Sequence, residues 1–525
     1  TYTVLQTLTL EEMKQKTCEM NLLYEHLTEM KEQAAQEQAA GEAKDPERVK
    51  ELFGETLDEV EKLSTCYSLS QITYYQNIFD EENQEIQAEL LDDVMDYGDR
   101  LNVAIRELCK SPYQNTMTEL MNAEQVEAYL EYEEMTDEEK ELTAKENSLE
   151  QEYEQLSSEE FYYEYDGEEW DLNRLNMEAD EMDHDAVIEI YQGICKQRND
   201  AVGEVFVELV DVRNEIAKLN GYDNYAEYAY DAVYVRDYTL DETRDLLKEI
   251  RKHVVPVMAD MKDVLNDTDY MRLYTEGQGI ESTSIIEQIG PYLEEIDPEL
   301  KDTQEHFLKY RLYDMDTSQN KANTAFTMRL SYFKDGFIYG QMYDNYMDYY
   351  NVIHEFGHYN NVYRSADTFF ESSNNIDVSE IHSQGMQMLF YDYYDELLGE
   401  DIGDIYAFYD VYSMADNAIS TALISEFEIA AYENPDMTLE ELNKLYLQLS
   451  RRYGMQYDSK IKELYTWSEV PHIFTSPCYY FSYLTSAFSS LDILTMAEED
   501  RHEAVETNMT LTNIPRYVPY CTPVE

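Results

Sequence analysis

The chain has 525 residues, of which 43% are hydrophobic, so it can bury a large folded core. It carries 112 acidic residues against 38 basic ones, a formal net charge of −74 at pH 7. Such a charge repels nucleic-acid phosphates and anionic membrane surfaces, and it excludes nucleic acid as a partner. It could favour cationic peptides over acidic ones. No apolar run approaches the ~18 residues that a membrane-spanning segment needs.

The first region, residues 1–195, is expected to be a helical lobe. It is rich in good helix formers, and no proline interrupts the chain between Pro112 and Pro256. The very acidic stretch from Glu124 to Asp183, which includes Trp170, is interpreted as amphipathic helix with a solvated face. A binding surface is the alternative interpretation of this stretch.

The second region, residues 196–525, is expected to hold the functional site. Near its start an apolar stripe with helical spacing predicts a face packed in the core. The stripe consists of Val205, Leu209, Val212, Ile216 and Leu219. The six cysteines form no C-x-x-C pair, which favours buried thiols over a zinc ribbon or a redox motif and leaves one or two disulfides open.

The segment Arg329–Met342 has the composition of a β-hairpin. Two short runs of aromatic and β-branched residues flank Lys334, Asp335 and Gly336, which are typical of a hairpin turn. Because a metal-binding motif follows shortly afterwards, one strand could line a peptide-binding cleft and bind substrate through its backbone N–H and C=O groups. An ordinary core hairpin is the alternative.

Residues 354–358 read His-Glu-Phe-Gly-His, which matches the H-E-x-x-H pattern. His354 and His358 share one face of a helix, so both imidazoles can reach one zinc ion. Glu355 projects beside the metal, where it can accept a proton from zinc-bound water. The pattern therefore predicts one Zn²⁺ per chain, with Glu355 as general base. The alternative is a helix with two unmetallated histidines.

A catalytic zinc needs a third protein ligand and one open position. We expect Glu380, on the next predicted helix, to be that ligand, with Glu371 as a weaker candidate. His382 lies on roughly the opposite face of its helix, so we expect it to support or pack against the site. Gln384, one turn beyond Glu380, could orient a ligand histidine through its amide oxygen.

These motifs resemble the M3 family of metallopeptidases, the oligoendopeptidase F and thimet oligopeptidase group. Three segments carry the resemblance: Leu209–Tyr230, the hairpin with HEFGH and Glu380–Gln384, and His472–Ser486. The resemblance implies a mainly α-helical, elongated, two-lobed zincin of the gluzincin type. Its deep central channel would hold the zinc, and a small β-hairpin or sheet would lie next to the HExxH helix.

The resemblance also implies a function. The protein would be a zinc-dependent endopeptidase that hydrolyses short unfolded oligopeptides, because a narrow channel excludes folded proteins. His354, His358 and Glu380 would hold the zinc, and Glu355 would act as the general base.

The family further uses a C-terminal histidine and tyrosines, and the matching residues are His472, Tyr480 and Tyr483. They would hydrogen-bond the substrate and stabilise the oxyanion of the tetrahedral intermediate. Two positions depart from the family pattern. His382 stands where the thimet branch has proline, and residues 475–478, Thr-Ser-Pro-Cys, replace a glycine-rich loop.

Two other functions remain open on the sequence. One is a catalytically weak peptide-binding protein, against which the intact Glu355 argues. The other is a zinc exopeptidase, for which the acidic excess would suit a substrate α-amino group. The resemblance implies a cytoplasmic location, and an exported or surface-anchored protein with a signal before Thr1 is the alternative. Other first-row metals could also occupy such a site.

Overall fold

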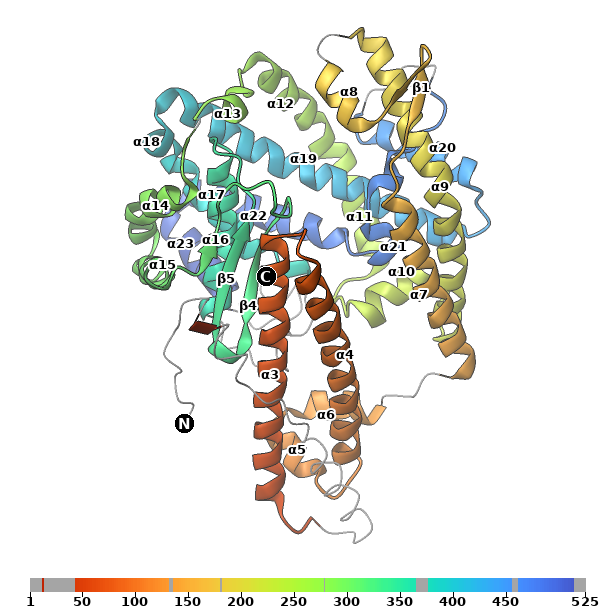
Figure 1. Ribbon diagram of the computed structural model, residues 1–525, viewed down its shortest axis with the longest axis vertical. Coiled ribbons are helices and arrows are strands. Elements are labelled where there is room, and N and C mark those ends of the chain that lie inside the picture. Colours follow the sequence, from red (N-terminus) through yellow and green to blue (C-terminus); the bar gives the residue numbers. More distant parts are fainter. Residues whose placement is uncertain are drawn as a thin grey trace.

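The computed structural model describes residues 12–13, 43–131, 136–179, 182–277, 279–364, 376–455 and 461–513. These residues are mostly helical and include two small sheets (Figure 1), which confirms the mainly α fold expected from the sequence. Within the described ranges, no helix has both the length and the apolar character that a membrane crossing requires.

The N-terminal part consists of long helices and one short hairpin. Its elements are α3 (Pro46–Gln76), α4 (Glu81–Cys109), α5 (Gln114–Leu120), α6 (Ala123–Glu131), α7 (Asp137–Ser157), β1 (Tyr163–Tyr165), β2 (Glu168–Trp170), α8 (Leu172–Glu178) and α9 (His184–Leu219). Helices α3 to α6 share a hydrophobic cluster of their own, whereas α7 and α9 join the main core. Helix α9 runs through residue 195, and the division of the chain there stays a prediction.

The helix starts follow local chemistry. Asp45 accepts the N–H of Arg48 and precedes a proline at the first position of α3. Thr136 and Glu139 form a capping box at the start of α7. These short-range hydrogen bonds fix where the two helices begin.

The acidic stretch 124–183 is not helical throughout, so that prediction is partly wrong. Helices α6 and α7 lie within it, but β1 and β2 pair antiparallel with Tyr163 opposite Trp170. Trp170 is buried against Ile190 and Ile194 of α9. Burial of this indole against α9 accounts for a hairpin that the charge pattern did not indicate.

The apolar stripe of α9 packs as expected except at its end. Val205, Leu209, Val212 and Ile216 are buried in the main core, as predicted. Leu219 is 45% exposed, because it is the last residue of α9 and the chain turns away at Asn220.

The middle of the chain supplies shorter helices and a three-stranded sheet. The helices are α10 (Tyr225–Tyr228), α11 (Leu240–Glu249), α12 (Val255–Asp267), α13 (Arg272–Thr275), α14 (Ser282–Ile296) and α15 (Pro298–Tyr310), with π-helical turns at Ala229–Val233 and Ile250–Val254. The strands are β3 (Tyr313–Asp314), β4 (Ala325–Leu330) and β5 (Asp335–Gly340).

The predicted hairpin is present, but its turn differs from the prediction. The sheet order is β3-β5-β4, with β4 antiparallel and β3 parallel to β5. Asp335 and Gly336 belong to β5 and pair with Leu330 and Arg329, while a 3₁₀ turn at Ser331–Phe333 and a left-handed Lys334 connect the strands. The turn therefore lies earlier than the glycine suggested.

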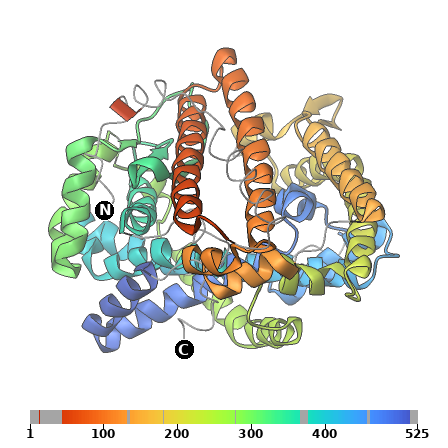
Figure 2. The ribbon, with the colours of Figure 1, turned by 90° about the horizontal axis from the view of Figure 1, so that it is seen from below.

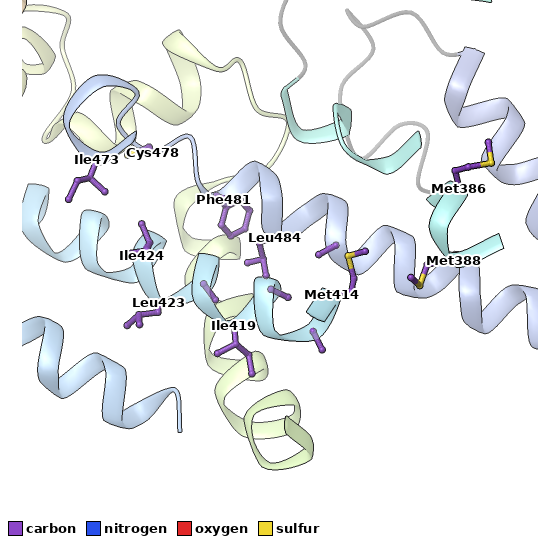
Figure 3. Packing of buried hydrophobic residues seen from close by; sticks show 14 of the residues in the cluster. Met386, Met388, Met414, Ile419, Leu423, Ile424, Ile473, Cys478, Phe481 and Leu484 are labelled. Carbon is purple, nitrogen blue, oxygen red and sulfur yellow. The ribbon is translucent and has the colours of Figure 1, made fainter. Parts of the chain in front are cut away.

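The C-terminal half carries the metal motif and the rest of the core. Its helices are α16 (Asp348–Arg364), α17 (Ile381–Phe390), α18 (Tyr394–Leu398), α19 (Glu400–Glu433), α20 (Leu439–Arg452), α21 (His472–Thr475), α22 (Phe481–Glu499) and α23 (Arg501–Asn513), with 3₁₀ turns at Ile376–Val378, Tyr391–Tyr393 and Thr466–Glu469. Figure 3 shows α19 packed against α22, where Met414 and Ile419 lie close to Phe481 and Leu484. Cys109, Cys195 and Cys478 are buried free thiols.

Helices of the remaining chain lie on both sides of the pair formed by α3 and α4. In Figures 1 and 2, α14 and α15 lie on one side of α3 and α4, and α7 lies on the other. The sheet and α16 lie next to α3, whose backbone carbonyl at Tyr75 accepts the hydroxyl of Tyr339 on β5 at 2.7 Å. The small sheet beside the HExxH helix is therefore as expected, and the deep channel stays a prediction.

Candidate metal centre

Helix α16 carries both histidines of the HExxH motif. Asp348 in its first turn is buried and accepts the backbone N–H groups of Tyr343 and Asp344 at 3.0 and 2.8 Å, which fixes how the chain enters the helix. The side that faces the core contains Tyr349, Val352, Ile353 and Phe356. The opposite side presents His354 and His358, one turn apart.

Helix α17, entirely buried, brings Glu380 to these histidines. Glu380 directly precedes the helix and its side chain makes no capping bond there. A Cβ atom at Gly357 would lie 2.7 Å from the carbonyl oxygen of His382 and from the Cα of Ser383. The glycine inside HEFGH therefore allows α17 to approach α16 closely enough for Glu380 to reach the site.

Three candidate ligand atoms converge. The Nε2 atoms of His354 and His358 lie 3.3 and 3.2 Å from Oε2 of Glu380. In the described part of the chain, this is the one group of three potential metal-ligating side chains whose ligand atoms all lie within 4.8 Å of one another. The side chains are 18%, 19% and 21% exposed, so the group can be reached from solvent. Glu371, the weaker candidate, lies outside the described residues.

The electrostatics couple the three groups. Burial alone would raise the pKa of Glu380, but the charge of His358 and hydrogen bonds from both histidines hold it well below its usual range. Burial lowers the pKa of His354, yet its hydrogen bond to Glu380 and the carboxylate charges raise it to about 9. A proton and a divalent cation would compete for the same nitrogen, as at any histidine metal site.

A chain of hydrogen bonds orients His354. Its Nδ1 lies 2.9 Å from Oε1 of Gln387, whose Nε2 donates to Asp410 at 3.2 Å. Asp410 also accepts the hydroxyl of Tyr394 at 2.8 Å, and burial raises the pKa of this carboxyl group to about 7. Donation from Nδ1 to the amide oxygen leaves Nε2 with its lone pair for a metal.

The prediction for Gln384 is wrong, because Gln387 takes the role expected of it. The buried Oε1 of Gln384 has no hydrogen-bond partner among the described residues. Helices α16 and α17 run antiparallel where they approach each other at Gly357. His358 therefore lies opposite His382, and His354 lies opposite Gln387, about one turn further along α17. The spacing of residues within α17 does not indicate how that helix crosses α16, so it could not predict this pairing.

His382 lies in the supporting position that the sequence predicted. Its Nε2 is 2.9 Å from Nδ1 of His358. This contact fixes the ring of His358 and leaves its Nε2 directed at Glu380.

Glu355 contacts the sheet. It is buried, and its Oε2 accepts the hydroxyl of Thr327 on β4 at 2.8 Å, while the Glu355 carbonyl lies 3.0 Å from the same hydroxyl. Strand β4 is at the edge of its sheet. Nothing in the sequence pointed to Thr327, since no spacing rule links a strand residue to a helix that follows it.

The C-terminal candidates form an aromatic cluster, defined here as His472, Tyr479, Tyr480 and Tyr483. Ring centroids of His472 lie 5.5, 5.1 and 6.1 Å from those of Tyr479, Tyr480 and Tyr483. Tyr479 was not predicted, although it adjoins Tyr480 in the sequence.

Burial favours the uncharged forms of the groups in the aromatic cluster. Burial lowers the pKa of His472 and raises the pKa of Tyr480. The pKa of Tyr483 is raised by burial, by Tyr479 and by the negative charge of Glu380. The phenols of Tyr480 and Tyr483 therefore keep their protons at neutral pH.

The loop that replaces the glycine-rich segment is strained. Cys478 has φ 64°, a left-handed conformation that favours glycine. Its N–H donates to the buried Glu428 at 2.8 Å, and its carbonyl accepts Arg236 Nη2 at 3.1 Å. A cavity of about 410 Å³ adjoins the loop and is lined by Pro477, Tyr479, Glu146 and Glu150, among others.

Comparison with solved structures identifies the fold. A chain assigned as an oligoendopeptidase F is 22% identical, and the match covers 99% of this chain and 94% of that one with a TM-score of 0.75. PZ peptidase A with an inhibitor matches equally well, at 22% identity, 97% and 94% coverage and a TM-score of 0.75. This chain has the oligoendopeptidase F fold.

More distant matches extend the comparison. Oligoendopeptidase F from Enterococcus faecium is 14% identical over 98% of this chain and 93% of that one, with a TM-score of 0.57. Metallocarboxypeptidase 1 of Trypanosoma cruzi is 12% identical over 90% and 95%, with a TM-score of 0.53. No protein-family model matches the sequence, and no curated protein matches it either. At these identities the shared property is the fold.

Proposed function

We propose that the protein is a zinc-dependent endopeptidase that hydrolyses short, unfolded peptides. The observation that carries this proposal is the convergence of His354, His358 and Glu380 within 4.8 Å, beside Glu355. Two imidazole nitrogens and one carboxylate oxygen are a donor set of catalytic zinc sites, in which one position stays open. The names of the similar structures, which are three peptidases and a metallocarboxypeptidase, support a peptidase.

The chain's own residues supply the proton transfers. When bound, zinc would polarise the scissile carbonyl and make a water molecule more acidic. Glu355 would accept a proton from the attacking water and deliver it to the leaving nitrogen. Thr327 donates a hydrogen bond to the Glu355 carboxylate, which holds this base in one orientation.

Substrate would lie between the edge strand and the aromatic cluster. Strand β4 carries Thr327 and could pair with an extended peptide, as edge strands do. Tyr480 and Tyr483, both protonated, would donate to the oxyanion and to the substrate backbone. Glu146 and Glu150 in the wall of the 410 Å³ cavity share one cation, Arg213, so one negative charge is left that would suit a basic substrate side chain.

An endopeptidase is favoured over a carboxypeptidase by the state of two buried arginines near the aromatic cluster. Arg213 is engaged by Glu146 and Glu150, and Arg236 is engaged by Asp377. Capture of a substrate carboxylate would require a cation, and these two already have acidic partners.

The test is mass spectrometry of products from a set of 8- to ~20-residue peptides and one folded protein, incubated with zinc-loaded enzyme. Glu355→Gln is the control, since it keeps the shape of the side chain and removes the base. We expect internal cuts in the peptides alone and a loss of about 10²- to 10⁴-fold in the control. Release of single terminal residues would indicate an exopeptidase. No cleavage by zinc-loaded protein would indicate a peptide-binding protein.

A further inference from the structure

A buried ion pair joins the two halves of the proposed site. The side chains of Arg236 and Asp377 are 1% and 2% exposed. Arg236 Nε lies 3.3 and 3.2 Å from the two carboxylate oxygens of Asp377, and Nη2 lies 3.2 Å from Oδ1. Neither residue was singled out by the sequence, and neither is in contact with the candidate metal ligands in the described hydrogen bonds.

Asp377 belongs to the segment that carries the ligand Glu380. It lies in the 3₁₀ turn Ile376–Val378, and the N–H of Ser379 closes that turn on the carbonyl of Ile376 at 3.1 Å. Glu380 follows Ser379 and directly precedes α17. Because only this short turn separates the two acids, a shift of Asp377 moves the backbone of Glu380.

The same carboxylate is bound by the segment that carries the tyrosines. Ser482 donates to Asp377 Oδ1 at 2.7 Å, between Tyr480 and Tyr483 in the chain. Thr485 and Ser486 of α22 donate to the backbone carbonyl of Asp377, each at 3.1 Å. The start of α22 is therefore attached to the ligand segment at both the side chain and the main chain of Asp377.

Arg236 adds a second attachment to the tyrosine segment. Its Nη2 donates to the carbonyl of Cys478 at 3.1 Å and to the hydroxyl of Ser482 at 3.2 Å. The planar guanidinium can bridge a carboxylate and a carbonyl at once, which the single ammonium group of lysine cannot reproduce. It is the carbonyl of the strained Cys478 that Arg236 holds.

The backbone around Arg236 is itself unusual. A π-helical turn at Ala229–Val233 precedes it, and Val235 has φ 49°, although a β-branched residue rarely adopts such a conformation. Arg236 also stacks over Tyr230, 4.2 Å from its ring centroid. Strain of this kind persists where the surrounding structure fixes the residue.

We propose that Arg236 is a positioning residue that holds the ligand turn at Asp377–Glu380 and the tyrosine turn at Cys478–Tyr483 in a fixed relation. It acts through Asp377, Cys478 and Ser482 and touches no reacting atom. The proposal rests on the proposed function for its effect on catalysis, but its effect on metal binding is independent of any peptidase activity.

The test compares Arg236→Lys with Arg213→Lys, a matched control. Arg213 is also fully buried and paired with acids, and it donates to the carbonyls of Ile473 and Phe474, but it does not contact Asp377. Cobalt(II) affinity is measured by competition with a chelator, together with the visible spectrum of the bound ion and with kcat and KM on a quenched peptide.

We expect Arg236→Lys to weaken cobalt binding by about 10-fold or more, to alter the visible spectrum and to lower kcat more than it raises KM. Arg213→Lys should leave cobalt affinity within about twofold of the wild type. Equal losses of affinity in both variants, or wild-type affinity in folded Arg236→Lys, would overturn the proposal.

Ser482→Ala is the second variant, because it removes one hydroxyl and should fold even if Arg236→Lys does not. We expect a smaller loss of cobalt affinity and of kcat in the same direction. Unchanged values of both in Ser482→Ala would argue against a positioning role. If the wild-type protein binds cobalt but cleaves no peptide, the proposed function fails while the affinity comparison still decides the role of Arg236.

Discussion

The metal centre and the aromatic cluster are built by different means. His354, His358 and Glu380 come from two helices adjacent in the chain, and their approach depends on a glycine at position 357. The aromatic cluster comes from a short segment near the C-terminus that is strained at Cys478 and is held by the buried residues Arg236 and Glu428 from distant segments. Sequence spacing determines the first, whereas tertiary contacts determine the second.

This difference predicts how each part responds to mutation. A metal ligand supplies one coordinating atom, so its loss removes binding outright. A residue of the aromatic cluster supplies a hydrogen bond or a support, so its loss should change rate or stability while the metal stays bound. The following experiments test this separation, from the largest expected effect to the smallest.

Removal of a ligand should abolish metal binding. We expect His358→Ala to lower the zinc content after dialysis from one ion per chain to none and to abolish peptidase activity, because two remaining ligands do not hold zinc. His253→Ala is the control, since the side chain of His253 is 62% exposed and lies 3.1 Å from Glu249 on the surface. Full zinc content in His358→Ala would show that the three residues are not the ligands.

Removal of the phenol hydroxyl at Tyr483 should affect the rate alone. Tyr483→Phe is expected to lower kcat by about 10²-fold, the cost of one oxyanion donor, with zinc content unchanged. Steady-state kinetics with zinc analysis of the same samples measures both. A variant with wild-type kcat would remove Tyr483 from the proposed site, and a variant without zinc would contradict the separation of the two regions.

Loss of the hydrogen bond between Gln387 and His354 should have a smaller effect on metal binding than loss of a ligand. Gln387→Leu should weaken zinc binding by about 10-fold, because Nδ1 of His354 loses its acceptor. Gln384→Leu is the matched control on the same helix, since the buried amide oxygen of Gln384 has no partner among the described residues. In chelator competition, the zinc affinity of Gln387→Leu should be lower than that of the wild type, and the zinc affinity of Gln384→Leu should equal it.

Ionisation of Glu428, which binds the Cys478 N–H next to the aromatic cluster, should make the stability of the protein depend on pH. Burial raises the pKa of Glu428 to about 7, although the Cys478 N–H and two arginines lower it. The folded protein therefore keeps a proton on Glu428 that the unfolded chain releases at lower pH. The free energy of unfolding therefore falls as the pH rises from the ordinary pKa of a glutamate toward 7. Above pH 7 the folded protein bears the full free-energy cost of a buried, ionised Glu428.

Glu428→Gln should remove this dependence, because its amide oxygen can still accept the Cys478 N–H. We expect the thermal midpoint of the variant, relative to the wild type, to be higher at pH 8 than at pH 5. Glu400→Gln, at an exposed position of the same helix, should show no such trend. Equal differences at both pH values would mean that Glu428 does not titrate in this range.

Several structural features followed from local patterns in the sequence. Good helix formers and the long proline-free span between Pro112 and Pro256 indicated helices, and the run before the metal motif indicated a hairpin. Errors arose where long-range packing prevailed over local patterns. Trp170 lies in a strand and packs against α9, where a helix was expected. The hairpin turn lies at Ser331–Lys334, earlier than the glycine suggested.

The sequence by itself determined the HExxH helix and the expectation that Glu380 would meet it, because helical spacing and metal chemistry are both local rules. Only the tertiary structure decided which groups support them. Thr327 reaches Glu355 from a strand, Gln387 reaches His354 through the crossing of α16 and α17, and Arg236 reaches the ligand turn from a distant segment. Contacts between remote segments depend on how whole helices pack, and no spacing within one segment encodes that packing.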